Sequence, residues 1–329
     1  MTGADIDRMT ARVYTAGRGP AGAAKRSAFW ALLALAAVIA GAGVVADSTA
    51  TVIGAMIVAP LMTPILGTTV GLVLAHRHQV VSSVVLVLAG ALLVAAIGYA
   101  LGLLVDFPVV AANNSQVAGR VSPRLIDLVA ALATGIVGAF ALVRPDVSDT
   151  LPGVAIAISL VPPLSVVGLT LESGAPAESF GALVLFGTNV AAIIATGTVI
   201  LLAYRVRDVA IETGRPVGKL SGRTLVAVGG LVVLVTIPLT YGSIELSDQQ
   251  QATAQARPVA QQWGERSGWA ITELAYRQNS LYITALGLPP KPDEAALRQA
   301  LNEAGLAEVD LHLSLVAGTS LDLPGGQPG

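Results

Sequence analysis

Seven long stretches without a charged side chain divide this sequence of 329 residues. A membrane span needs about 20 apolar residues, so we expect up to seven membrane segments, forming an all-α bundle within the lipid bilayer. Only 12% of the residues are charged, against about 25% in soluble domains, which excludes a soluble globular enzyme and a disordered chain. The stretches are residues 27–46, 48–76, 78–105, 128–143, 150–171, 179–204 and 224–244.

Charge and cysteine content narrow the classes of function further. Nineteen basic and 21 acidic residues give a net charge of -2, and this balance gives no reason to expect nucleic-acid binding. Three His and no Cys exclude thiolate catalysis, Fe–S clusters, Cys-based zinc sites and disulfides. The sequence contains no nucleophile elbow, phosphate-binding glycine loop or metalloprotease helix motif. We therefore expect no enzymatic activity, catalytic residue, metal site or cofactor.

Clusters of Lys and Arg indicate which ends of the segments face the cytoplasm. One cluster lies in the N-terminal arm, and another lies between the last two stretches. We therefore expect a multi-pass protein of the bacterial inner membrane, with a cytoplasmic N-terminus and an extracytoplasmic tail after residue 244. The clusters are Arg8, Arg12, Arg18, Lys25 and Arg26, and Arg205, Arg207, Arg215, Lys219 and Arg223.

The tail has a different composition and pattern. Residues 248–267 are rich in Gln and Ala and helical in pattern, and Pro292-Asp293-Glu294 opens a short second helix. Three further runs alternate polar and apolar residues, as half-buried strands do. The tail is therefore predicted to be a small α/β domain of order α-β-β-α-β, with His312 as a solvated surface residue. The expected strands are residues 270–275, 281–286 and 309–315.

A shift of 99 residues superposes part of the sequence on itself. Residues 47–67 resemble residues 146–168, and the shift lays Asp47 on Asp146. The flanking stretches follow the same shift, so we interpret the pattern as a duplicated unit of three membrane segments. The glycines of the repeat are Gly54, Gly67, Gly153 and Gly168. The predicted organisation is a cytoplasmic arm (1–26), repeat 1 (27–125), repeat 2 (126–205), a basic cytoplasmic loop (206–222), a final transmembrane helix (223–244) and the α/β domain (245–329).

Prolines interrupt the middle segment of each copy. Proline removes a backbone donor and obstructs a continuous helix, and carbonyls freed inside a membrane must find protein or water partners. Paired broken helices point to the midplane site of a transporter, while kinks that serve packing alone are the alternative. The sequence leaves open whether these segments span, giving inverted copies, or re-enter, giving parallel copies. The candidate substrate- or ion-binding residues are Asp47, Pro60, Thr63, Pro64, Ser159, Pro162, Pro163 and Asn189.

Each polar candidate also has a structural interpretation. Asp47 would cap the following helix or contact a cation. The hydroxyls of Thr63 and Ser159 would face a ligand or bond carbonyls of the preceding turn. Burying an unpaired amide costs a few kcal/mol, so Asn189 needs a partner and would serve as a contact between helices or line the site.

The broken segments also carry a family resemblance. Residues 47–64 resemble the signature of the domain-of-unknown-function 389 membrane proteins. Residues 151–164 and 185–189 are similar to later blocks of that family, so the resemblance covers roughly residues 28–205. Asp47 stands where many relatives carry Asn, which weakens a role for its charge in cation binding. The resemblance implies a hydrophobic integral membrane protein of bacteria and no particular activity.

Together these features predict passage of a small solute or ion through a site formed by the two broken segments, in a protein that assembles as a homo-oligomer. The alternative is a non-transporting oligomeric membrane anchor whose outer domain senses a signal or assembles with a partner. A wet, polar-lined cavity that reaches the breaks would favour transport, whereas a dry, packed centre would favour the anchor.

Overall fold

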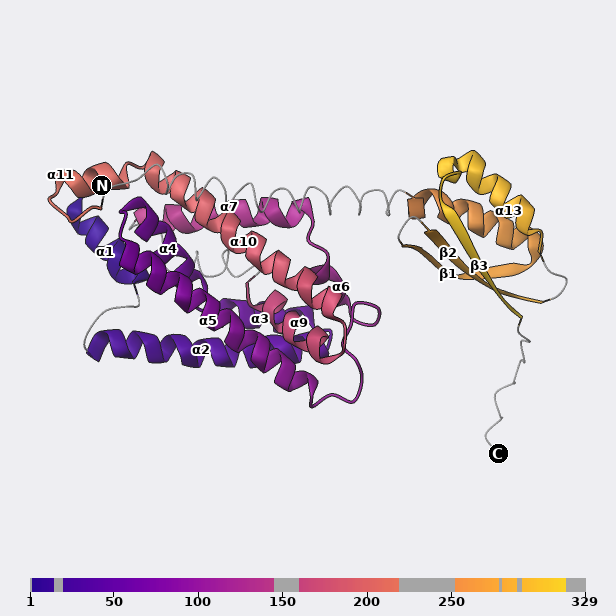
Figure 1. The fold of residues 1–329 in the computed structure, drawn as a ribbon, viewed down its shortest axis with the longest axis horizontal. Coiled ribbons are helices and arrows are strands. Elements are labelled where there is room, and N and C mark those ends of the chain that lie inside the picture. The colour runs from indigo at the N-terminus through magenta and orange to yellow at the C-terminus, as the bar shows by residue number, and fades with distance from the viewer. Residues whose placement is uncertain are drawn as a thin grey trace, which may run out of the picture. The chain divides into compact units, whose positions relative to one another are not determined.

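The computed structural model describes residues 2–14, 20–144, 160–218, 252–277, 280–288 and 292–317. The chain divides into two compact units, Met1–Gly242 and Ser243–Gly329. The described part of the first unit is helical, and the second combines a small sheet with helices (Figure 1). Two expected regions, residues 150–159 and the last stretch 224–244, lie outside the described residues.

The described part of the first unit contains four helices long and apolar enough to cross a membrane, and one bent pair that makes a fifth candidate span. The chain is thus a multi-pass integral membrane protein, as the uncharged stretches predict. The helices are α1 (Gly3–Val13), α2 (Pro20–Val45), α3 (Thr49–Val58), α4 (Met62–Val73), α5 (Arg77–Gly102), α6 (Ser115–Val121), α7 (Leu125–Val143), α9 (Val161–Glu172), α10 (Pro176–Ala203) and α11 (Val206–Glu212).

Side chains on the outside of the bundle suit a lipid environment. Leu88 and Leu92 of α5 are 62% and 72% exposed, and Val85 on the same helix is 57% exposed. Exposing so much apolar surface to water is unfavourable, whereas lipid tails accept it. The shortest uncharged stretch, residues 128–143, becomes long enough for a membrane span because α7 already begins at Leu125. Just before that residue, the Arg124 backbone amide donates to the Asp127 carboxylate at 2.9 Å.

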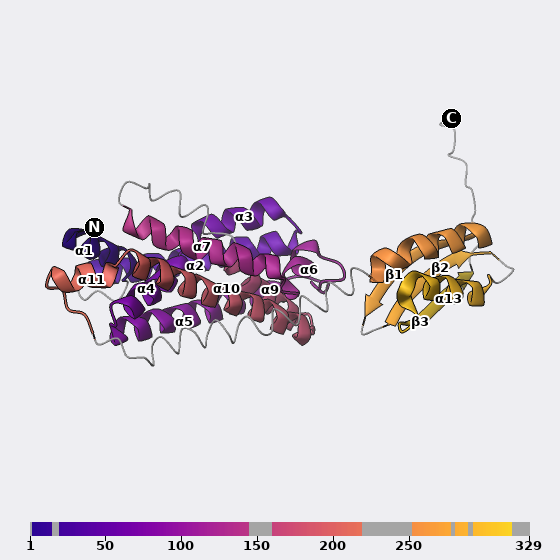
Figure 2. The same ribbon diagram turned by 90° about the horizontal axis from the view of Figure 1, so that it is seen from above.

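The broken segment α3–α4 connects opposite ends of the bundle. We call these the α11 end, which holds α1, α11 and the α4–α5 turn, and the α6 end, which holds α6 and the α2–α3 turn (Figures 1 and 2). At the α11 end, the Leu74 carbonyl accepts from the Gly218 amide at 3.0 Å. At the α6 end, Asn114 donates to the Val44 carbonyl at 2.7 Å. The chain therefore crosses the bundle between residues 49 and 73, with a bend of 47° at the break.

Helix α9 runs opposite to α4. It ends at the α6 end, where the Ser173 hydroxyl accepts from the Val109 amide at 2.9 Å. Helix α10 then returns to the α11 end, as Figure 1 shows. Helices α5 and α10 are therefore antiparallel, and so are α2 and α7 (Figure 1).

The helix bounds coincide at the shift of 99 residues. The shift carries Met62–Val73 onto Val161–Glu172 and the first residue of α5 onto the first residue of α10. The turns coincide as well, because Ala75 and Gly174 both adopt positive φ, of 54° and 74°. In each turn the next amide bonds the carbonyl five residues back, at 2.8 Å for His76 and 2.9 Å for Ala175. This is a helix C-terminal motif built on a left-handed residue, and these two matching turns lie at opposite ends of the bundle.

The second unit has the predicted order of elements. A helix over residues 252–267 is followed by strands β1 and β2, helix α13 and strand β3. Strands β1 and β2 are antiparallel, and β2 and β3 are parallel. His312 is exposed as expected, and its ring stacks on Tyr282 with the centroids 4.7 Å apart. The bounds are β1 (Trp269–Arg277), β2 (Ser280–Gly287), α13 (Glu294–Leu301) and β3 (Asp310–Ala317).

Candidate functional site

A cavity of about 230 Å³ lies at the break between α3 and α4. Two of the expected site residues, Pro60 and Thr63, line it. Its wall also includes residues from α1, from α7 and from the start of α9, so four separate parts of the chain meet there. The described lining residues are Arg12, Val13, Met56, Ile57, Ala59, Pro60, Leu61, Met62, Thr63, Leu66, Gly138, Ala141, Leu142, Leu160 and Val161.

Pro60 explains why the helix breaks at this point. It has no N–H, so the Met56 carbonyl cannot receive the bond that a continuous helix would give it. Instead α3 ends at Val58, and the Thr63 amide donates to the Pro60 carbonyl at 3.2 Å as α4 begins. A break of this kind inside a bilayer is tolerated where it lines a cavity or is covered by protein.

The first turn of α9 borders the same cavity. Leu160 and Val161 line it, and Pro162 and Pro163 follow as buried residues of the first helical turn. Proline is well suited to this position because the amides of a first turn have no partner within the helix. The structure thus brings together the starts of α4 and α9. Pro64, Pro162 and Pro163 are buried in these helices, and Ser159 lies outside the described residues.

Asp47 lies away from the cavity, at the α6 end. Its backbone adopts a φ of 50°, and its carboxylate accepts from the Ser115 hydroxyl at 2.7 Å and the Gln116 amide at 3.0 Å. These hydrogen bonds hold the pKa of Asp47 below its usual range. Ser48, rather than Asp47, is the N-cap of α3, and its hydroxyl accepts from the Thr51 amide at 3.4 Å. Asp146, the residue that corresponds to Asp47 in the second copy of the repeat, lies outside the described residues.

Asn189 lies inside α10 and is only 1% exposed. It is not among the described residues that line the cavity. The structure therefore shows that Asn189 is buried, and it shows no contact of Asn189 with the cavity.

The buried threonines have a local role, because Thr68, Thr69 and Thr170 donate to carbonyls four residues earlier, at 3.0, 3.1 and 2.7 Å. Hydroxyls satisfied in this way are typical of membrane helices.

Of the repeat glycines, Gly168 lies at the tightest helix crossing. A Cβ there would overlap the Ala95 carbonyl oxygen of α5, whereas a Cβ on Gly54 would meet nothing within 4 Å. Close approach of this kind is what small residues allow between membrane helices. Gly67 lies on α4 beside the Val13 carbonyl, and Gly153 lies outside the described residues.

The N-terminal helix is the part of the site that sequence reasoning missed. We expected residues 1–26 to be a cytoplasmic arm and placed no site residue there; residues 3–13 form α1, and Arg12 and Val13 line the cavity. The signal was the spacing of Ile6, Met9 and Val13, which places three apolar side chains on one helical face. Within the described ranges, no three His, Asp or Glu side chains are grouped so that they could hold a metal ion.

Comparisons with known proteins identify the domain that contains the break. The chain is 32% identical over 173 residues to an uncharacterised protein of Methanocaldococcus jannaschii, which covers 53% of this chain and 53% of that protein. The chain thus matches about half the length of this archaeal relative. No solved structure matches the chain. Residues 56–195 match the family described as Domain of unknown function (DUF389), and this segment contains the cavity-lining residues of α4 and α7, the described start of α9 and most of α10.

Proposed function

We propose that this protein passes a small solute or ion across the membrane through the cavity at the break. The observation that carries the proposal is that the starts of two half-length helices, α4 and α9, line one cavity. Transporters place binding sites where discontinuous helices meet near the bilayer midplane. The proposal assigns no catalytic step to the chain. Its site residues are Pro60 and Thr63 on the cavity wall, and Pro64, Pro162, Pro163 and Asn189 in the surrounding helices.

The symmetry of the first unit supports alternating access. Helices α4 and α9 have coincident bounds and turns at the shift of 99 residues and run in opposite directions, which supports a duplicated unit of three segments in inverted orientation. Inverted repeats let one half rock against the other around a fixed central site. That residues 150–172 form a second broken segment is a prediction within this proposal, since residues 150–159 lie outside the described residues.

Charge supports an orientation with the α11 end in the cytoplasm, as the positive-inside rule favours. Among the described residues, the basic side chains at that end are Arg8, Arg12, Lys25, Arg26, Arg77, Arg144, Arg205, Arg207 and Arg215, against Arg120 and Arg124 at the α6 end. One further crossing by residues 224–244 would then place the second unit outside. We assign the protein to the plasma membrane on this basis.

The alternative function is that of a non-transporting oligomeric anchor with an outer sensing or assembly domain. The observation in its favour is a sheet face in the second unit on which Tyr282, Leu286 and Val316 are each more than 40% exposed. Exposed apolar side chains on one face are typical of surfaces that bind other proteins. Under this alternative the cavity would have no role in flux.

A swelling assay in proteoliposomes tests the two functions. Vesicles with the protein are transferred to isotonic glycine, potassium acetate or KCl, and swelling is followed by light scattering. We expect faster swelling than in empty vesicles for at least one solute, and loss of that excess in Thr63→Trp, whose indole would enter the cavity. The matched control is Ile53→Trp on α3, where the native side chain is 50% exposed toward lipid.

Equal swelling of protein-containing and empty vesicles for all three solutes would reject transport of small solutes and favour the anchor. Excess swelling that survives in Thr63→Trp would move the pathway away from the break. Size-exclusion profiles of both Trp variants that match the parent would establish that both variants are folded.

A further inference from the structure

The N-terminal helix α1 lies within the α11 end of the bundle. Ile6, Met9 and Val13 are each no more than 2% exposed. They pack in one apolar cluster with side chains from α4, α7, α10 and α11, which are Leu66, Val70, Val73, Leu74, Ala139, Val143, Leu201, Val206 and Ala210. A short helix that buries its whole apolar face among four other helices occupies the interior of that end.

The last turn of α1 reaches the cavity. Arg12 and Val13 form part of its wall, and a Cβ on Gly67 of α4 would lie 3.0 Å from the Val13 carbonyl oxygen. The Lys25 ammonium of α2 donates to the Ala11 carbonyl at 2.6 Å. Helix α1 therefore lies between the cavity at the α3–α4 break and the α11 end of the bundle.

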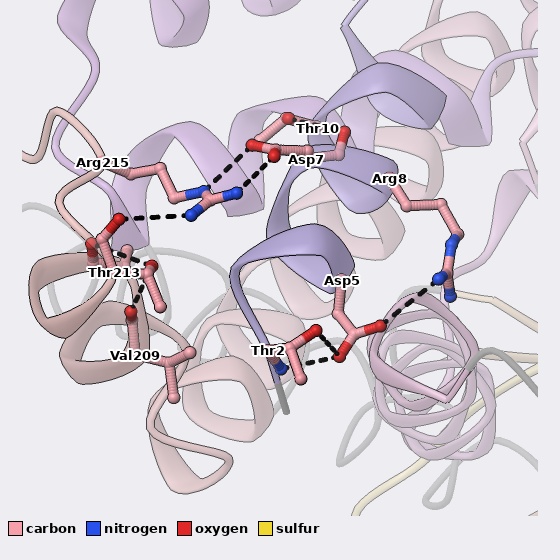
Figure 3. A network of polar contacts seen from close by, with 9 residues as sticks. Thr2, Asp5, Asp7, Arg8, Thr10, Val209, Thr213 and Arg215 are labelled. Atoms are coloured by element: carbon pink, nitrogen blue, oxygen red, sulfur yellow. Dashed lines mark hydrogen bonds and ion pairs between the residues drawn. The ribbon is translucent and has the colours of Figure 1, made fainter.

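One ion pair ties α1 to the loop after α11. The Arg215 guanidinium donates to both carboxylate oxygens of Asp7, with Nε 3.0 Å from Oδ1, and it also donates to the Thr213 carbonyl (Figure 3). These contacts hold the pKa of Asp7 below its usual range. Arg8, on the same helix, pairs with Asp5 of α1 itself at 3.4 Å (Figure 3).

The loop that carries Arg215 is itself fixed to the bundle. The His76 ring lies 2.6 Å from the Pro216 carbonyl. The Arg207 guanidinium donates to the Val73 carbonyl at 3.1 Å and to the Gly218 carbonyl at 2.8 Å. Arg215 is thus anchored on the α4–α5 turn, whereas its partner Asp7 lies on a separate short helix.

We propose that α1 is a removable plug that closes the cavity toward the α11 end, and that the Asp7–Arg215 pair is its latch. Exposed ion pairs are weak and screened by salt, so a latch of this kind permits reversible opening. The role of the plug in flux rests on the proposed function, but closure of the cavity can be measured without any transport.

The test is the labelling rate of a cysteine at the break. The chain has no native Cys, so Thr63→Cys in lipid nanodiscs reports on access by a water-soluble maleimide. We expect Asp7→Asn to label several-fold faster than the parent, and the exchanged pair Asp7→Arg with Arg215→Asp to restore slow labelling. Arg8→Ala is the matched control and leaves the rate unchanged, because its partner lies on α1.

A reference cysteine at Glu212, which is exposed beside the plug, labels equally in all variants if the fold is intact. Equal Thr63→Cys rates in the parent, Asp7→Asn and a chain lacking residues 2–14 would overturn the plug. Faster labelling without any solute-dependent swelling would keep the plug and reject the proposed transport. The two proposals therefore fail separately.

Discussion

Gly98 of α5 lies against Gly168 of α9, and a Cβ on Gly168 would overlap the α5 backbone at Ala95, Gly98 and Tyr99. The shift of 99 residues carries Gly98 onto Gly197 and Thr69 onto Gly168. A Cβ on Gly197 would lie 3.0 Å from the Thr69 methyl group. The second helix pair, α10 with α4, thus repeats the first, α5 with α9, so each half of the unit packs its long helix on the half-length helix of the other.

We expect Gly168→Ala to destabilise the bundle because its Cβ meets backbone that cannot move aside. Overpacking costs about 1–3 kcal/mol, which exceeds the gain of about 0.5–1 kcal/mol from replacing a helical Gly by Ala. Gly187→Ala is the matched control, since a Cβ on this α10 glycine meets nothing within 4 Å. Thermal unfolding in detergent should show a lower midpoint for the first variant and an equal or higher one for the second. Equal midpoints would contradict the α5–α9 packing.

The coincident bounds of α4 and α9 could be predicted from sequence because their proline and glycine positions recur at a shift of 99 residues. Gly at 168 is required by a close crossing, and Pro64 and Pro163 occupy the same position in the first turn of α4 and α9. The crossing direction of the broken segments could not be predicted, because a proline break is compatible with a span and with a re-entrant loop. The contacts that decide it, such as Leu74 with Gly218, join residues far apart in the sequence.

Strand β2 could be predicted from a local pattern, whereas helix α1 depends on contacts with distant parts of the chain. Polar–apolar alternation in Leu281–Leu286 is a local pattern, so β2 was predicted within a few residues. Helix α1 has only 11 residues, and short helices are marginal without tertiary packing. Its partners on α4 and α11 are distant from it in the sequence, and no local pattern indicates the pairing of Asp7 with Arg215.

Two substitutions of predicted site residues should lower flux while leaving the protein folded. Thr63→Val removes a hydroxyl from the cavity wall at nearly constant volume, and Asn189→Ala removes a buried amide. The control is Thr68→Val, the same substitution further along α4, where the hydroxyl donates to the Pro64 carbonyl at 3.0 Å. Solute-dependent swelling should fall in the first two variants and persist in the third. Equal rates in all three would remove Thr63 and Asn189 from the pathway.

Acidification should release the latch. The Arg215 hydrogen bonds lower the pKa of Asp7 in the folded state, so its stabilisation is complete above the ordinary aspartate pKa of about 3.9 and is lost as the pH falls through the lowered value. Thermal midpoints of the parent and Asp7→Asn should differ at pH 7 and converge as the pH is lowered below 4. A difference that persists undiminished at low pH would mean that Asp7 acts through contacts other than its charge.

Single cysteines at four turns test the direction of the crossings. Arg77 and Glu212 lie at the α11 end, and Ser115 and Ala175 lie at the α6 end. In intact cells an impermeant maleimide should therefore label Ser115→Cys and Ala175→Cys, and it should label the other two only after the membrane is opened. Labelling of Ala175→Cys together with Arg77→Cys from one side would mean that α4 and α9 end on the same face. The copies would then be parallel, and a site built on inverted half-helices would lose its basis.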